Sequence, residues 1–299
     1  MSMAKKVKDS RDDVRAALVK ALEAWSTPYD IAPDGVFGCV ASVKCGDVTL
    51  SSEQLDIEVY VPFDDDMEVN EAEIKVYNIS PSTLEQLKKG EKLTVEAGYR
   101  GDTGVIFSGY ISAVQSKRDG ADRCTTIKAL DDIKEHKLAA TSYKAGTKAS
   151  YILKDLLDKT GMPIAVYKVR RDYTYEDAET VEGELMENIS RYARVCGISV
   201  YVSRGKIYAR YIKEGDNIAF AVSSDAGMVG SPAAYEEEVT AEDFKEVVHG
   251  YEVEMILQHR MCAGAIVDIK SRDAQGRYRV CSGEHFFAPD GATTRVRMY

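Results

Sequence analysis

"NISPSTLEQLKKGEKLTVEAGYRGDTGVIFSGYI" spans Asn78 to Ile111 and combines a short helix signal with strands rich in Tyr and Gly. Ser80 or Ser82 can cap the helix, Pro81 suits its first turn and Gly90 its end, so we expect one to two turns of helix. The stretch contains no His, no Cys and no obvious nucleophile. Two interpretations follow: the scaffold of an enzyme whose chemistry lies elsewhere, or the working surface of a protein that only assembles.

Short strands with tight turns surround this helix, from about Asp34 to Asp132. The runs "EAEIKVYNIS" and "KLTVEAGYR" alternate apolar and polar residues, which is typical of half-buried strands. The composition of "RGDTG" and the dipeptide Asp119-Gly120 indicate hairpin turns. The pattern predicts a small barrel or sandwich with the short helix closing one end.

Residues 11–25 predict an amphipathic helix. Val14, Leu18, Leu22 and Trp25 recur at steps of three and four, with charged residues between them. The apolar stripe of this helix packs either on its own domain or on a partner, and the sequence leaves both interpretations open.

The pattern changes to α+β between about residues 140 and 213. A helix capped by Thr147 and stopped at Gly161 precedes a strand, and a second helix that stops at Gly197 precedes two strands around an Arg204-Gly205 turn. From Asn217 onward the signals are β again, with a hairpin turn near 274–276 and an exposed loop at 227–244.

Together these patterns predict a mainly β fold with an α+β insertion. Two small β-barrel domains flank an α+β module, and a helix precedes them. The expected boundaries are an N-terminal helix and linker at 1–33, a first β-barrel domain at 34–138, the α+β module at 139–213 and a second β-barrel domain at 214–299.

The composition excludes several classes of protein. The 299 residues carry a formal net charge of -10, with a pI of about 5.1, which argues against nucleic-acid binding. An acidic surface either serves solubility or repels DNA that must slide past the protein. No run predicts a transmembrane helix or a secretory signal, so we expect assembly in a cytoplasm. The six scattered cysteines form no C-x-x-C pair, which disfavours disulfides.

Motifs that carry chemistry are missing. The spacing of His136, His249, His259 and His285 matches no metal site, and we expect solvent-facing or hydrogen-bonded histidines. "DDDMEVNEAEIK", residues 64–75, lacks the Gly and Glu of a calcium loop and predicts a surface turn. We therefore predict no catalytic residue, no cofactor and no metal. The chain has 18 Tyr against 7 Phe, which mildly favours protein interfaces.

The run from Ala72 to Val114 resembles the signature of bacteriophage tail hub proteins, in which a "YN-(L/I)-S" strand end, a short helix, an "AGY" strand and an "F-G-I--V" strand follow in order. The matching residues are Tyr77, Asn78, Ile79, Ser80, Leu84, Leu87, Gly90, Ala97, Gly98, Tyr99, Ile106, Phe107, Gly109, Ile111 and Val114. Looser matches extend from about Asp34 to the C-terminus. The relatives are the late-control protein D type of P2-like phages, the PBSX-like prophage hub and the N-terminal part of type VI secretion spike proteins.

The resemblance implies a structural hub of a phage-type tail baseplate, in a virion or a tailocin of the contractile kind. Such hubs are homotrimers whose two β-barrels per chain present six barrels, which adapts a sixfold tail tube to a threefold spike around a central channel. The implied partners are further copies of the chain, the tail tube or a tube adaptor, and the central spike. The tape measure protein and the baseplate wedge are further expected partners, DNA passes only in transit, and no membrane insertion is expected.

Our interface candidates are Glu96, Gly98, Tyr99, Arg100, Phe107, Tyr251 and Tyr278, and we hypothesise that acidic side chains line the channel. Two alternatives stay open. One is a tail-associated peptidoglycan hydrolase, although no fused lysozyme domain is visible after the last strand. The other is a receptor- or carbohydrate-binding β module at the tail tip, although the single Trp25 offers no obvious sugar platform.

Overall fold

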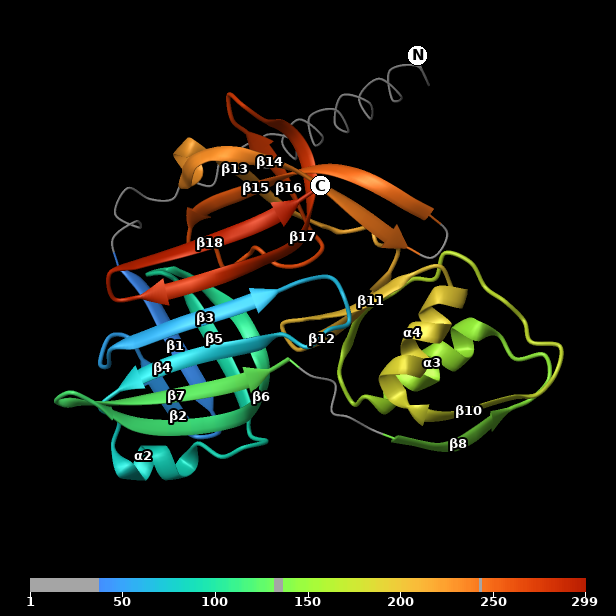
Figure 1. Ribbon diagram of the computed structural model, residues 1–299, viewed down its shortest axis with the longest axis horizontal. Helices are drawn as coiled ribbons and strands as arrows, with labels where there is room; N and C mark the ends of the chain where they lie inside the picture. The colour runs from blue at the N-terminus through green and yellow to red at the C-terminus, as the bar shows by residue number, and fades with distance from the viewer. Residues whose placement is uncertain (1–37, 132–136, 242–243) are drawn as a thin grey trace, which may run out of the picture.

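The computed structural model describes residues 38–131, 137–241 and 244–299, and this part of the chain is mainly β. The predicted mainly β fold with an α+β insertion is confirmed, as Figure 1 shows: a long curved sheet runs from the blue and green strands to the red ones, and a smaller helical unit lies beside it. The predicted helix at 11–25 lies outside the described residues, as does His136.

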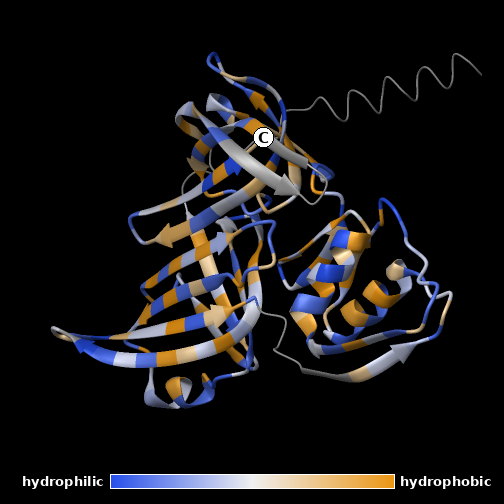
Figure 2. Ribbon diagram, turned by 45° about the vertical axis from the view of Figure 1, so that its right-hand side comes forward, coloured by the Kyte–Doolittle hydropathy of each residue, from blue (hydrophilic) through white to orange (hydrophobic). Residues whose placement is uncertain are grey.

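The first β unit consists of residues 39–130. Its elements are β1 (Cys39–Cys45), β2 (Val48–Ser51), β3 (Ile57–Phe63), β4 (Glu71–Tyr77), α2 (Pro81–Gln86), β5 (Lys92–Tyr99), β6 (Asp102–Asp119) and β7 (Asp122–Leu130). Alternate residues of β3 and β4 are buried, as the sequence pattern predicts. Figure 2 shows the same alternation as orange and blue bands along the strands. Burial of these apolar faces drives formation of the first core.

The module consists of residues 137–210. Its elements are β8 (Lys137–Tyr143), α3 (Ala149–Lys159), β9 (Ile164–Tyr167), β10 (Glu179–Glu184), α4 (Leu185–Val195), β11 (Ser199–Ser203) and β12 (Lys206–Arg210). The helices pack against each other and bury Ile152, Leu156 and Ile189 in a second core, between the β8–β10 pair and the β11–β12–β9 sheet.

The second β unit consists of residues 216–298. Its elements are β13 (Asp216–Ser223), the 3-10 turn η2 (Ser224–Ala226), β14 (Met228–Ala241), β15 (Phe244–Ile256), β16 (Ala265–Lys270), β17 (Gln275–Ala288) and β18 (Gly291–Met298). The strands enclose a third core.

The two β units share one 13-stranded sheet. The path runs β14-β15-β18-β17-β3-β4-β7-β6-β5-β1-β2, and β16 and β13 branch from β17. The connection is antiparallel pairing of β17 with β3, from Gly283 opposite Phe63 to Phe287 opposite Val59. The seam therefore joins strands that are more than two hundred residues apart in the sequence.

The three cores also exchange side chains. Leu257 and Phe287 of the second half pack in the first core, while Phe63 and Tyr201 pack in the third. Met67 packs against the core of the module. Because each unit buries apolar surface from another, the units stabilise one another.

Local signals in the opening stretch are confirmed, apart from the end of the helix. Ser80 caps α2 by accepting a hydrogen bond from the Thr83 amide at 3.1 Å, and Pro81 occupies the first turn. The helix ends at Gln86 rather than at Gly90. Gly90 instead takes a positive φ of 86° and donates its amide to the Ile111 carbonyl, which carries the chain into β5.

Three sequence interpretations were wrong. Residues 228–241 form β14, not a loop, because the Gly230–Pro232 irregularity disguises a strand that pairs along β15. Thr147 does not cap α3; the cap residue is Lys148, and the Thr147 hydroxyl donates to the Lys144 carbonyl. The 274–276 turn lies earlier, since β16 ends at Lys270 and β17 begins at Gln275.

Candidate assembly surface

The β5–β6 hairpin holds five of the seven predicted interface residues. Its turn follows Tyr99, and Gly98 has a φ of 150°. A Cβ on Gly98 would lie 2.3 Å from the Asp102 carbonyl oxygen, so only glycine allows the two strands to approach this closely. The hairpin is therefore held in one shape by its backbone.

The hairpin is fastened to the second β unit at its tip. Arg260 donates to both oxygens of Asp102, at 2.6 and 2.8 Å, which is a bidentate pair. These hydrogen bonds hold the pKa of Asp102 below its usual range. Two residues further along β6, a Cβ on Gly104 would lie 2.2 Å from the His259 ring. The tip is thus part of the contact between the units.

The exposed side of this hairpin carries the charged candidates. Glu96 pairs with Lys44 at 3.0 Å, and Arg100 pairs with Glu53 at 3.1 Å. Both pairs are solvent-accessible, so each contributes little to folding and leaves its charges available to a partner.

Phe107, like Gly98, is buried, unlike the other candidates. Its side chain is 3% exposed in the first core, next to residues of the neighbouring strands. Phe107 therefore packs inside its own chain.

Tyr251 and Tyr278 lie in the second β unit, on β15 and β17. Their rings form an edge-to-face pair with centroids 5.4 Å apart, and both pack against the third core while remaining partly accessible. The candidates thus form two groups, one in each β unit.

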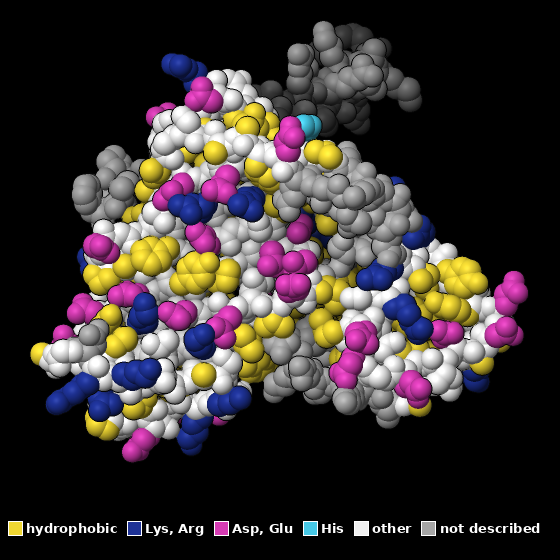
Figure 3. Space-filling view, in the orientation of Figure 1, with side chains coloured by type: hydrophobic (Ala, Val, Ile, Leu, Met, Phe, Trp, Pro, Cys, Tyr) yellow, Lys and Arg dark blue, Asp and Glu magenta, His cyan; other side chains and the backbone are white. Residues whose placement is uncertain are grey.

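Sequence reasoning missed an aromatic pair on the outer face of the sheet. Tyr60 of β3 lies opposite Phe286 of β17, and the two side chains are 41% and 42% exposed. The Tyr60 hydroxyl donates to Glu284 at 2.9 Å. In Figure 3 a yellow patch crosses this part of the face between charged side chains. The alternation of "IEVYVPF" points Tyr60 outward, but it does not reveal the partner on β17.

Ion pairs flank this aromatic pair, which we call the Tyr60–Phe286 patch. On the β17 side, Arg295 binds Glu254 at 3.2 Å and Glu284 at 3.4 Å. On the β3 side, Lys75 binds Glu58 at 3.2 Å. The patch is therefore an apolar centre with a polar rim, which is the composition of a protein interface.

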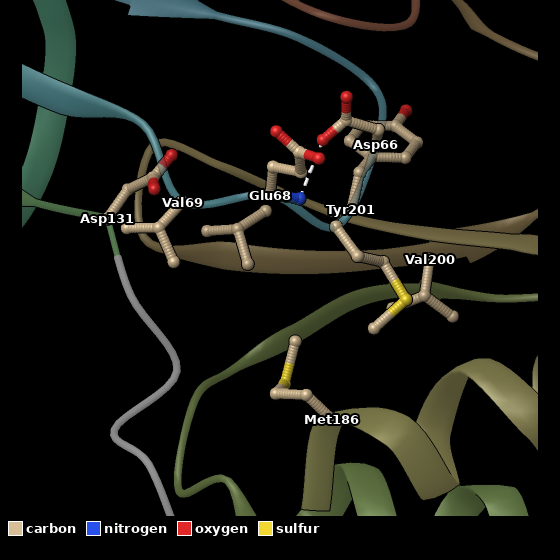
Figure 4. A pocket seen from close by; sticks show the side chains of 9 residues that line it. Asp66, Glu68, Val69, Asp131, Met186, Val200 and Tyr201 are labelled. Atoms are coloured by element: carbon tan, nitrogen blue, oxygen red, sulfur yellow. Dashed lines mark hydrogen bonds between the residues drawn. The ribbon is translucent and has the colours of Figure 1, made fainter.

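A second feature missed from sequence is the β3–β4 loop, residues 64–70. The predicted surface turn fits the exposed residues Asp66, Glu68 and Val69. It does not account for Asp65, which pairs with the buried Arg279, or for Asn70, which is only 8% exposed. Figure 4 shows the loop above the module, with Met186 and Val200 across a small cavity from Val69.

The turn between β11 and β12 enters the junction from the module. Arg204 and Gly205 have positive φ values of 51° and 70°, as the predicted two-residue turn requires. The Arg204 guanidinium donates to the carbonyls of His259 and Met261, at 2.6 and 3.0 Å. The module is thereby fixed to the second β unit.

Within the described residues, no group of His, Cys, Asp and Glu has the arrangement of a metal site. His285 is buried and bonded through its ring nitrogens to Thr294 and Met261, while His249 is exposed beside Glu236. These two fit the expected hydrogen-bonded and solvent-facing histidines. All six cysteines are free thiols. None of the described helices has both the length and the apolar character needed to cross a bilayer.

Similar structures share this fold at low sequence identity. The tail protein from Neisseria meningitidis MC58 matches with a TM-score of 0.61 and 10% identity, covering 88% of this chain and 96% of its own. The 43 kDa tail protein of prophage MuSo2 from Shewanella oneidensis matches with a TM-score of 0.59 and 9% identity, covering 87% and 97%. The c3393 protein of E. coli, a type VI secretion system component, matches with a TM-score of 0.60 and 9% identity, covering 86% and 76%.

No curated protein sequence matches the chain. The family model described as "Baseplate hub gp41" matches residues 40–245, which is more than half of the 299 residues. This range covers the first β unit from Val40 onward, the module, and β13, η2 and β14 of the second unit. The chain belongs to the baseplate hub gp41 family.

Proposed function

We propose that this protein is the structural hub of a contractile-type tail baseplate, that it works as a homotrimer, and that it adapts a sixfold tail tube to a threefold central spike. In this proposal each chain contributes two β domains, at 34–138 and 214–299, around the module at 139–213. The trimer surrounds part of the central channel, through which DNA passes. It is assembled in the bacterial cytoplasm.

The observation that carries this proposal is the presence of two β units with separate cores in one continuous sheet. Three such chains offer six β units to a sixfold partner and a single threefold axis to a spike, which is symmetry matching. A rigid seam between β3 and β17 supports this role, because the two units must keep a fixed relation to each other.

The partners follow from this arrangement. The hub contacts its own copies, the tail tube or a tube adaptor, and the spike; the tape measure protein and the baseplate wedge complete the set. We place the contacts at Glu96, Gly98, Tyr99 and Arg100 in one unit and at Tyr251 and Tyr278 in the other. The Tyr60–Phe286 patch joins them, because exposed aromatic surface with a polar rim marks interaction sites.

We further propose that the hub is not an enzyme and that acidic side chains line its channel. The net charge of -10 supports the second point, since a wall of the same sign as DNA does not retain it. Membership of the baseplate hub gp41 family supports the first point.

The mass of the purified protein in solution tests the proposal. A trimer has about 99 kDa, three times the chain mass of 33.0 kDa, and an assembled particle holds three copies per six-subunit tube ring. A monomer that hydrolyses peptidoglycan, with turnover abolished by one carboxylate substitution, would overturn it. So would a monomer that binds glycans.

A further inference from the structure

The β3–β4 loop contacts residues of both β units and of the module. Asp65 pairs with Arg279 of the second β unit. Met67 packs against the core of the module, and its sulfur accepts a hydrogen bond from the Ser190 hydroxyl at 3.1 Å. Asn70 binds Asp131, the residue that follows β7 of the first unit. Seven residues thus connect the module to both β units.

Two carboxylates meet at one amide in this loop. The Asn70 side-chain nitrogen donates to Asp64 and to Asp131, each at 3.3 Å, and the Asn70 backbone amide donates to Asp131 at 2.8 Å. Asn70 and Asp131 are each 8% exposed. Among the described residues, no Lys or Arg forms an ion pair with Asp64 or Asp131. Two negative charges therefore share neutral donors in a poorly solvated place, which is unfavourable.

We propose that the β3–β4 loop is a latch that holds the module against the two β units, and that ionisation of Asp64 and Asp131 loosens this latch. The loop closes firmly when one or both carboxyl groups carry a proton, because a neutral carboxyl needs no counter-charge and can itself donate. When both groups are ionised, opening the loop to water lowers its free energy, because water solvates the two charges.

The direction of the response follows from the burial of the two groups. Burial raises the pKa of Asp64 to about 6, with the nearby Asp66 adding to the effect, and burial raises the pKa of Asp131 to about 7. A carboxyl group whose pKa is higher in the closed state keeps a proton there that it loses on opening. The latch is therefore firmest below about pH 4, near the ordinary pKa of an aspartate, and loosens as pH rises through 6 to 7.

Among the residues that the structure describes, the other charged groups around the loop do not cancel this effect. Asp65, Asp66 and Glu68 lie on the loop itself and add negative charge. Arg279, from β17, is engaged by Asp65. Arg204, from the β11–β12 turn, lines a cavity with Asp131, but its guanidinium donates to backbone carbonyls.

Hydrogen exchange of the full chain tests the latch. Exchange is measured at pH 5, 6, 7 and 8 by mass spectrometry and corrected for the intrinsic rate at each pH. We expect peptides that cover residues 64–70 and the start of α4 to lose protection roughly tenfold or more between pH 5 and pH 8. Peptides from the interior of β4 keep their protection. Equal protection of the loop at pH 5 and pH 8 would overturn the proposal.

One substitution that removes a negative charge and one that adds a negative charge distinguish the latch from a general loss of stability. Asp131→Asn removes one charge and retains a carbonyl that accepts from Asn70, so the loop keeps its protection at pH 8. Asn70→Asp adds a third carboxylate and reduces protection already at pH 6. The exposed Asp177→Asn in the module changes neither. If Asn70→Asp fails to fold, Asp131→Asn is sufficient as a test. If the protection of the loop depends on pH in Asp131→Asn as it does in the wild-type protein, the latch is contradicted.

Discussion

Tyr60 of β3 lies directly opposite Phe286 of β17, and this pair bridges the two strands that join the β units. Both residues are more than 40% exposed, with ion pairs of Lys75 and Arg295 on either side of them. Exposed aromatic side chains contribute little to the folding of a chain, and they contribute strongly when a partner covers them. Because the pair lies at the seam, substituting it changes a surface that belongs to both β units.

Replacing the pair by Tyr60→Ser and Phe286→Ser is expected to separate folding from assembly. The free energy of unfolding falls by about 1 kcal/mol or less, because only a cross-strand contact at the surface is lost. In the proposed trimer, the dissociation constant, measured by sedimentation or native mass spectrometry, increases about tenfold or more, since a desolvated aromatic anchor is removed. Tyr151→Ser, on an exposed Tyr of the module, serves as the matched control. Unchanged trimer affinity in the double variant contradicts a role for the patch between subunits.

The sequence predicted what depends on neighbouring residues. The Ser80 cap, the Arg204-Gly205 turn and the alternation of β3 and β4 each arise from a few adjacent side chains, and each is present. The pairing of β3 with β17 was not predicted, because no local pattern specifies a partner more than two hundred residues away.

The same reason explains why the contacts of residues 64–70 were missed. Three consecutive aspartates indicate a surface turn, and only the tertiary structure brings Arg279 to Asp65 and Asp131 to Asn70. Phe107 shows the reverse case, in which a residue expected at the surface is buried. Its place in a conspicuous stretch suggested an interface, whereas its strand face points into the core.

Gly98 and Gly101 test whether the close approach of the β5 and β6 backbones requires glycine. Gly98→Ala is expected to lower the free energy of unfolding by about 2 kcal/mol or more, because its Cβ would lie 2.3 Å from the Asp102 carbonyl and its φ is 150°. Gly101→Ala also has a positive φ, of 90°, but meets nothing within 4 Å, so it costs only about 1 kcal/mol. Urea unfolding of the two variants measures the difference. Equal losses would show that backbone conformation alone, and not close approach, requires glycine at Gly98.

The buried Asp65–Arg279 pair is expected to behave unlike the exposed ones. Asp65→Asn leaves the Arg279 charge, whose side chain is 4% exposed, without a counter-ion, and destabilises the fold by about 3 kcal/mol. Glu53→Gln removes the partner of Arg100 at the surface and changes stability by less than about 1 kcal/mol. The double variant Asp65→Asn with Arg279→Met recovers part of the loss, because no buried charge remains. Thermal unfolding of the four proteins tests this, and a larger loss in the double variant than in Asp65→Asn would contradict it.

The burial of His285 predicts that the protein loses stability as pH falls, whereas the latch loosens as pH rises. Burial lowers the pKa of His285 to about 3, while its Nδ1 and Nε2 atoms contact Thr294 and the Met261 carbonyl at 2.8 and 3.1 Å. The unfolded chain binds a proton at this residue below about pH 6.5, and the native chain binds it only near pH 3. The stabilisation that neutral His285 gives the native state is therefore complete above pH 6.5, and it falls continuously as pH decreases towards 3.

We expect His285→Gln, which keeps a side-chain donor and acceptor but does not titrate, to lose less stability than the wild-type protein between pH 6.5 and pH 4. Urea unfolding across this range measures the slope, and the exposed His249→Gln is the control, which should retain the wild-type slope. Equal slopes for wild type and His285→Gln would show that His285 does not set the acid limit.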